Sequence, residues 1–89
     1  MNNKLTLYGK YFREIENGTK TKEYRKNTLY YRSRIRDSYG VVKHDCIRFT
    51  NGYGRNRPFI IVELKDVLET KEMFTLYLGK ILSKGNVGD

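Results

Sequence analysis

The chain has very few of the residues that constrain small proteins covalently or hold metals. Its 89 residues include one cysteine, one proline, one histidine and no tryptophan. A single cysteine, Cys46, excludes an internal disulfide, and Cys46 with His44 gives too few ligands for a zinc site. The longest strongly apolar run, Pro58–Val62, is far shorter than the roughly 20 residues of a membrane span. We therefore expect no metal, no cofactor and no membrane partner. Because the first residues lack the apolar stretch of a signal peptide, we expect a cytoplasmic protein.

Positive charge is what the chain has in excess. Eighteen Lys and Arg residues against ten Asp and Glu residues give a net charge of +8. Residues 20–57 hold 11 of the basic and three of the acidic residues, so the whole excess lies there, together with five of the eight tyrosines. Cations hold phosphates and aromatic rings stack on unpaired bases. This segment therefore predicts a nucleic-acid interface. Its candidate residues are Lys20, Lys22, Arg25, Lys26, Arg32, Arg34, Arg36, Tyr53, Arg55 and Arg57. The alternative is a solvated basic surface with partly buried tyrosines.

The spacing of apolar residues predicts short strands and helices in quick succession. We expect strands over 4–7, 19–25, 45–50, 58–67 and 72–82, with helices over 8–15 and 28–36. The order is β-α-β-α-β-β-β, which indicates the α+β class with about five strands in a small, curved or closed sheet. We expect one domain over residues 1–84 and a flexible tail over 85–89.

Particular residues should anchor or end these elements. Asn17-Gly18 should end the first helix, and Asn27 or Thr28 should cap the second. The expected buried stripe of the first helix is Tyr8, Tyr11, Phe12 and Ile15, and the expected anchors of the second are Leu29, Tyr30 and Ile35. Ile60, Val62 and Leu64 alternate in the most apolar run. We therefore expect a central strand there.

The spacing of Gly18, Lys20, Glu23 and Arg25 resembles the Gly-x-Lys-x-x-Glu-x-Arg signature of the ASCH domain, a branch of the PUA-like fold. The segments 8–12, 45–49, 51–54 and 76–81 also resemble the family, and together the match covers residues 5–82. The resemblance implies a small PUA-like β-barrel with a cleft beside the signature strand, and RNA as the partner. Some members of the family hydrolyse acetylated cytidine or RNA.

The candidate catalytic residues, if the protein is an enzyme, are Lys20 and Glu23. In the similar cytidine-amide hydrolases the position of Glu23 is a threonine, and a catalytic glutamate lies in an extra segment for which the link 67–73 is too short. Lys20 is carried over, but the other two groups are not. On a regular strand Glu23 and Arg25 share one face while Lys20 lies on the other, unless a bulge or the start of the strand brings Lys20 round. The alternative is a structural Glu23–Arg25 ion pair.

Three functions remain open from the sequence. The first is an RNA-binding module that uses the basic face and the signature cleft. The second is a hydrolase of a modified nucleoside or an RNA phosphodiester. The third is a basic inhibitor or adaptor, encoded by a phage or mobile element, that docks on a protein or nucleoprotein partner. Arg55 and Arg57 flank a glycine-containing turn that could grip phosphate beside Tyr53. Glu69 and Glu72 are interpreted as solvated charges.

Overall fold

The computed structural model describes residues 3–36 and 45–86. In chain order its elements are β1 (Asn3–Leu7), α1 (Gly9–Glu16), β2 (Lys22–Lys26), α2 (Leu29–Ile35), β3 (Cys46–Asn51), β4 (Phe59–Glu69) and β5 (Met73–Gly85). This order confirms the predicted β-α-β-α-β-β-β. β5 continues to Gly85, where we expected the tail to begin. Within the described ranges, no helix has the length and apolar character needed to cross a membrane.

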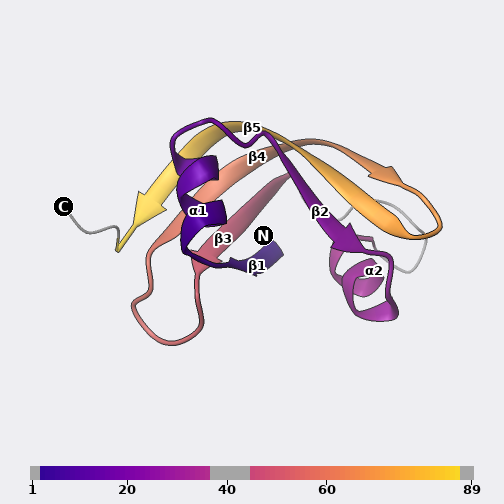
Figure 1. Cartoon of the computed structure of the whole chain (residues 1–89), viewed down its shortest axis with the longest axis horizontal. Coiled ribbons are helices and arrows are strands. Elements are labelled where there is room, and N and C mark those ends of the chain that lie inside the picture. Colours follow the sequence, from indigo (N-terminus) through magenta and orange to yellow (C-terminus); the bar gives the residue numbers. More distant parts are fainter. Residues whose placement is uncertain (1–2, 37–44, 87–89) are drawn as a thin grey trace.

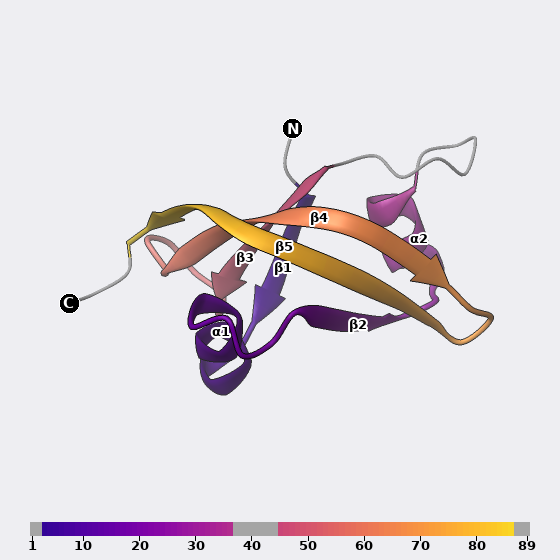
Figure 2. The ribbon, with the colours of Figure 1, turned by 90° about the horizontal axis from the view of Figure 1, so that it is seen from above.

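The strands form one mixed five-stranded sheet in the order β1-β3-β4-β5-β2. β1 pairs with β3 in parallel, whereas the other neighbours are antiparallel. The long β4–β5 pair arches over the molecule and curls the sheet into a half-barrel, with α1 and α2 beneath the arch (Figure 1). β1 and β2 are the two edges of this sheet, so they border its open side. Figure 2 shows the same arch from above.

β4 lies in the middle of the sheet, as the apolar alternation predicts. Ile60 and Val62 are buried in the core, and Leu64 packs against it. The register between β4 and β5 shifts three times between Ile61 and Asp66, which marks bulges or irregularities. Bulges bend a strand and increase its twist. They account for the arch that two such long strands make.

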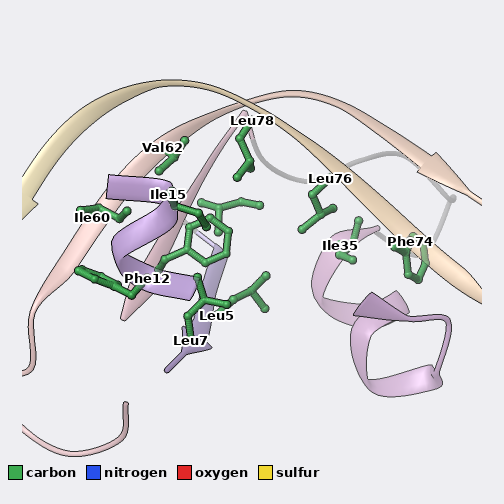
Figure 3. Close-up of a cluster of buried hydrophobic side chains, with 12 residues drawn as sticks. Leu5, Leu7, Phe12, Ile15, Ile35, Ile60, Val62, Phe74, Leu76 and Leu78 are labelled. Carbon is green, nitrogen blue, oxygen red and sulfur yellow. The ribbon is translucent and has the colours of Figure 1, made fainter. Parts of the chain in front are cut away.

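A single hydrophobic cluster fills the concave side of the sheet (Figure 3). α1 closes it from below with Phe12 and Ile15, while α2 contributes Ile35. The remaining members come from the strands and are Leu5, Leu7, Ile47, Phe49, Ile60, Val62, Phe74, Leu76 and Leu78.

Both helices bury less of their surface than we predicted. Tyr8 and Tyr11 are more than half exposed, so the buried stripe of α1 is only Phe12 and Ile15. Leu29 and Tyr30 are also exposed, and Ile35 is the only one of the three expected anchors that is buried. The reason is length, because helices of eight and seven residues present only one or two positions to the sheet.

The predicted helix boundaries are confirmed. The Thr28 side chain accepts a hydrogen bond from the Tyr31 N–H at 3.3 Å and caps α2. Gly18, after the end of α1, has φ +83°, a left-handed conformation that glycine adopts without a Cβ penalty. Gly18 thereby turns the chain from α1 towards β2.

Candidate nucleic-acid interface

The signature residues come together on the concave side of β2. Glu23 is only 6% exposed, because it points inward from the edge strand. Its Oε2 accepts a hydrogen bond from Arg25 Nη2 at 2.7 Å, and its Oε1 lies 3.3 Å from Lys20 Nζ. The Tyr24 N–H also donates to Oε1 at 3.2 Å. Glu23 therefore holds two cations side by side, and we call these three side chains the Lys20–Glu23–Arg25 triad.

Lys20 reaches this group because β2 begins later than predicted. We expected the strand over 19–25, whereas it spans Lys22–Lys26. Lys20 lies in the link after Gly18, where its N–H donates to the Glu14 carbonyl at 2.9 Å. Strand alternation does not apply in this link, so the Lys20 side chain turns to the same side as Glu23. We expected a bulge or a strand start just after Gly18 to bring Lys20 round, whereas Lys20 lies before the strand begins.

Arg25 connects the two edges of the half-barrel. Its Nη2 donates to the Thr6 carbonyl of β1 at 3.0 Å, and its Nη1 donates to the Tyr31 hydroxyl of α2 at 3.1 Å. The Thr6 carbonyl lies on an edge strand, where it would otherwise lack a ladder partner on this side. One guanidinium thus joins β2, β1 and α2. The triad lies on the open side of the half-barrel, between the edge strands β1 and β2, which we call the seam.

A cleft of about 460 Å³ lies at this seam. Aromatic rings surround its cations. Lys20 Nζ is 5.7 Å from the centre of the Tyr11 ring and 5.6 Å from that of Tyr24, and Arg25 is 5.5 Å from the Tyr31 ring. These distances are within the range of cation–π attraction. The lining residues are Leu7, Tyr11, Lys20, Glu23, Tyr24, Arg25, Lys26 and Tyr31. Tyr11 and Tyr31 were not predicted here, because they come from helices whose placement the local pattern does not specify.

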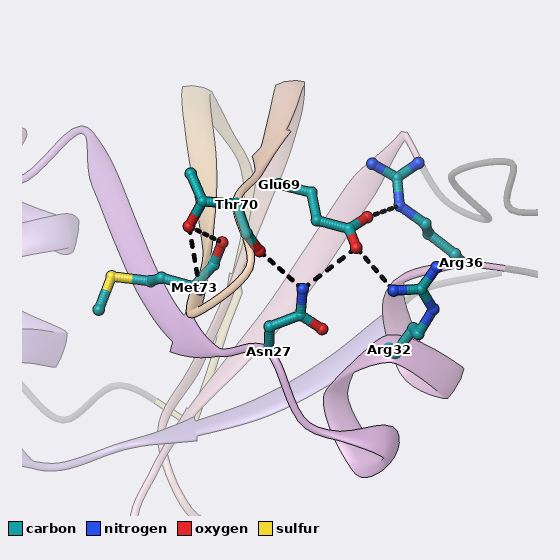
Figure 4. Close-up of polar contacts among 6 residues, drawn as sticks. All are labelled: Asn27, Arg32, Arg36, Glu69, Thr70 and Met73. Atoms are coloured by element: carbon teal, nitrogen blue, oxygen red, sulfur yellow. Dashed lines mark hydrogen bonds and ion pairs between the residues drawn. The ribbon is translucent and has the colours of Figure 1, made fainter.

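A second polar cluster corrects our interpretation of Glu69 as a solvated charge. At the end of β4, Glu69 accepts hydrogen bonds from Arg32 Nη1 and Arg36 Nε, both at 2.7 Å, and from Asn27 Nδ2 at 3.1 Å (Figure 4). The hydrogen bond from Asn27 and that from Arg36 lower the pKa of the Glu69 carboxyl. Glu69 therefore links α2 to the β4–β5 hairpin. Arg32 and Arg36 have a structural role, because both are paired with Glu69.

The other predicted cations are distributed over the molecule. Lys26 lines the seam cleft. Lys22 lies 5.3 Å from the Tyr77 ring of the neighbouring strand, and Arg34 lies 4.8 Å from the Tyr30 ring of its own helix. Lys22, the residue before Glu23 on β2, is exposed and is not among the residues that line the cleft. These contacts keep both cations on aromatic surface outside the triad.

Tyr53, Arg55 and Arg57 belong to the loop between β3 and β4, which lies at the opposite end of the sheet from α2 in both views (Figures 1 and 2). The candidate residues of this loop and those of α2 therefore lie at two ends of the sheet. Tyr53 does not line the seam cleft. Its ring instead contacts Tyr8, with centroids 6.0 Å apart and an interplanar angle of 63°. Arg57 Nε donates to the Asn51 carbonyl at 2.8 Å, which holds the loop closed.

His44 lies outside the described residues, and Cys46 begins β3 with partial exposure. Comparison with protein-family models, curated proteins and solved structures finds no match to this chain. The resemblance to the ASCH domain therefore stays a prediction. The geometry of the seam cleft and the charge around it are the grounds for a functional proposal.

Proposed function

We propose that this protein is an RNA-binding module of the PUA-like, ASCH type, whose ligand occupies the seam cleft between β1 and β2. One observation carries the proposal: a buried glutamate holds a lysine and an arginine side by side in a cleft that tyrosines line. Phosphate needs fixed cations, and a base needs an aromatic face. The triad and its surrounding rings supply both within one cleft.

The partition of charge within the triad supports this role. Glu23 neutralises one of the two cations, and Lys26, exposed at the end of β2, adds another. The cleft therefore keeps a net positive charge that attracts a polyanion. Lys20 acts as a point charge, whereas the Arg25 fork is already committed to Glu23, Thr6 and Tyr31. We infer that Lys20 makes the phosphate contact and that Arg25 holds the cleft in shape.

The same contacts favour binding over hydrolysis. A general base must be within hydrogen-bonding reach of the proton that it removes. The oxygens of Glu23 are occupied by Lys20, Tyr24 and Arg25, and its side chain is only 8% exposed. Glu23 is placed to position cations, not to meet a substrate.

The test is fluorescence anisotropy of a labelled single-stranded RNA of about 12 nucleotides, a length within the site sizes of small binding folds. Lys20→Ala should weaken binding and reduce the slope of log K against log salt by about 0.7, the value for one single-strand phosphate contact. Lys80→Ala removes the same charge from an exposed position of β5 and is the matched control. Equal slopes and affinities for the two variants would contradict the proposal, as would a wild-type protein that does not bind RNA.

A further inference from the structure

Four exposed tyrosines lie on segments that lead from the β3–β4 loop, past the start of α1, to the seam cleft. Tyr53, Tyr8, Tyr11 and Tyr24 are 76%, 60%, 53% and 50% exposed, respectively. A single exposed tyrosine is ordinary, but large aromatic side chains seldom lie in succession on a surface without a partner. We call these four residues the tyrosine track.

The first half of the track is held in place by two hydrogen bonds that backbone N–H groups donate. The N–H of Gly52 donates to the Leu7 carbonyl at 2.7 Å, and the N–H of Gly9 donates to Asn51 Oδ1 at 3.0 Å. These bonds fix the β3–β4 loop against the junction of β1 and α1. Tyr53 and Tyr8, which belong to these two segments, are thereby kept in ring contact.

The second half of the track leads into the seam cleft. Tyr8 is the N-cap residue of α1, and Tyr11 in the first turn of this helix donates its N–H to the Tyr8 carbonyl at 2.9 Å. Lys20 Nζ then lies between the Tyr11 and Tyr24 rings, less than 6 Å from each centroid at 5.7 and 5.6 Å. The track therefore ends at the cation that we assign to phosphate.

Cations accompany the rings along the whole track. The Arg57 guanidinium lies over Gly52, 3.5 Å from where a Cβ would stand, and the Arg13 guanidinium lies 3.6 Å from the same point on Gly9. Together with Lys20 they place one positive charge near each part of the track. An alternation of rings and cations matches a polymer whose bases and phosphates alternate.

We propose that the tyrosine track binds single-stranded nucleic acid, with unpaired bases stacked on its rings and phosphates held by Arg57, Arg13 and Lys20. This inference rests on the proposed function and extends it from one cleft to a path several nucleotides long. A duplex does not fit, because its base faces are already stacked on one another. The path runs from the β3–β4 loop, past the start of α1, to the seam.

The experiment measures anisotropy of a labelled oligouridylate of about 12 nucleotides and of the corresponding RNA duplex. Stacking contributes about 1–3 kcal/mol per base, so Tyr8→Ala and Tyr53→Ala should each weaken single-strand binding by roughly 5- to 150-fold. Tyr8→Phe and Tyr53→Phe keep the ring and should bind as wild type does. Tyr30→Ala is the matched control, because Tyr30 is 57% exposed on α2, at the other end of the sheet from Tyr8 and Tyr53.

The outcomes separate this inference from the proposed function. If Lys20→Ala loses affinity while Tyr8→Ala and Tyr53→Ala bind as wild type does, the track is overturned and the cleft stands. Equal affinity for the duplex also overturns the track. A wild-type protein that binds no oligonucleotide overturns both. Because the two rings are exposed, their removal should leave the thermal unfolding midpoint nearly unchanged, which circular dichroism will check.

Discussion

Removing the Glu23 carboxylate tests whether the triad is a buried, structural counterion centre. Glu23→Ala leaves Lys20 and Arg25 side by side without their shared anion, at side-chain exposures of 19% and 13%. It also removes one of the three partners of the Arg25 guanidinium, which joins β2 to Thr6 of β1 across the open seam. We therefore expect the substitution to leave two neighbouring cations without a counterion and to weaken the contact between β2 and β1.

The magnitude follows from the burial of the two cations. A hydrogen bond to a charged group contributes about 1.5–3 kcal/mol, and removal of one partner from a buried pair costs about 3–5 kcal/mol. Because water still reaches part of Lys20 and Arg25, we expect a loss of about 3 kcal/mol for Glu23→Ala, at the lower end of the second range. In a domain of this size, that loss lowers the melting temperature by about 12–24 °C.

Urea unfolding followed by circular dichroism measures the loss, with Glu72→Ala as the control. Glu72 is the same residue type in an exposed turn, so its removal should change stability by less than about 0.5 kcal/mol. Glu23→Gln keeps the shape and one acceptor and should lose about 1–2 kcal/mol. A double-mutant cycle with Arg25→Ala should show a coupling within the roughly 0.5–3 kcal/mol range of contacting residues. A Glu23→Ala loss no larger than that of Glu72→Ala would refute the reasoning.

Three further predictions follow from single contacts. The pKa of Glu69 is lowered in the folded protein, mainly by the hydrogen bond from Asn27. The ionised carboxylate therefore stabilises the fold above its ordinary pKa of 4.5, and this stabilisation is lost as the pH falls through the lowered pKa. Glu69→Gln should therefore reduce the difference between urea midpoints at about pH 3 and pH 7; an unchanged difference would contradict this. Desolvation, followed by the interaction with Tyr53, raises the pKa of Tyr8 above 10.0, so Tyr53→Phe should lower it in a phenolate absorbance titration, and a Tyr8 pKa that does not move would argue against the contact. Gly18→Ala should cost about 1 kcal/mol in thermal unfolding, because alanine at φ +83° is strained, and Gly18→Asn should cost less; a neutral alanine would show that the helix end tolerates another conformation.

Most of the element order was readable from local sequence. The two-residue spacing of Ile60 and Val62 predicted β4, because a strand in a half-exposed sheet buries both side chains in only one orientation. Gly18 and Thr28 marked helix boundaries because left-handed turns and capping oxygens depend on the residue itself. The grouping of Glu23 with Arg25 followed from strand alternation alone. These features have causes within a few residues of one another.

The sequence could not show which distant groups would meet. Whether a tyrosine is core or surface depends on what packs over it, and so Tyr8 and Tyr11 were predicted to be buried although short helices leave them exposed. Glu69 gave no local signal, because Arg32 and Arg36 reach it only after α2 folds back onto the β4–β5 hairpin. The sequence alone determines the total positive charge. The tertiary structure decides that the cations of the β3–β4 loop and those of α2 lie at opposite ends of the sheet, because strand order separates these two segments.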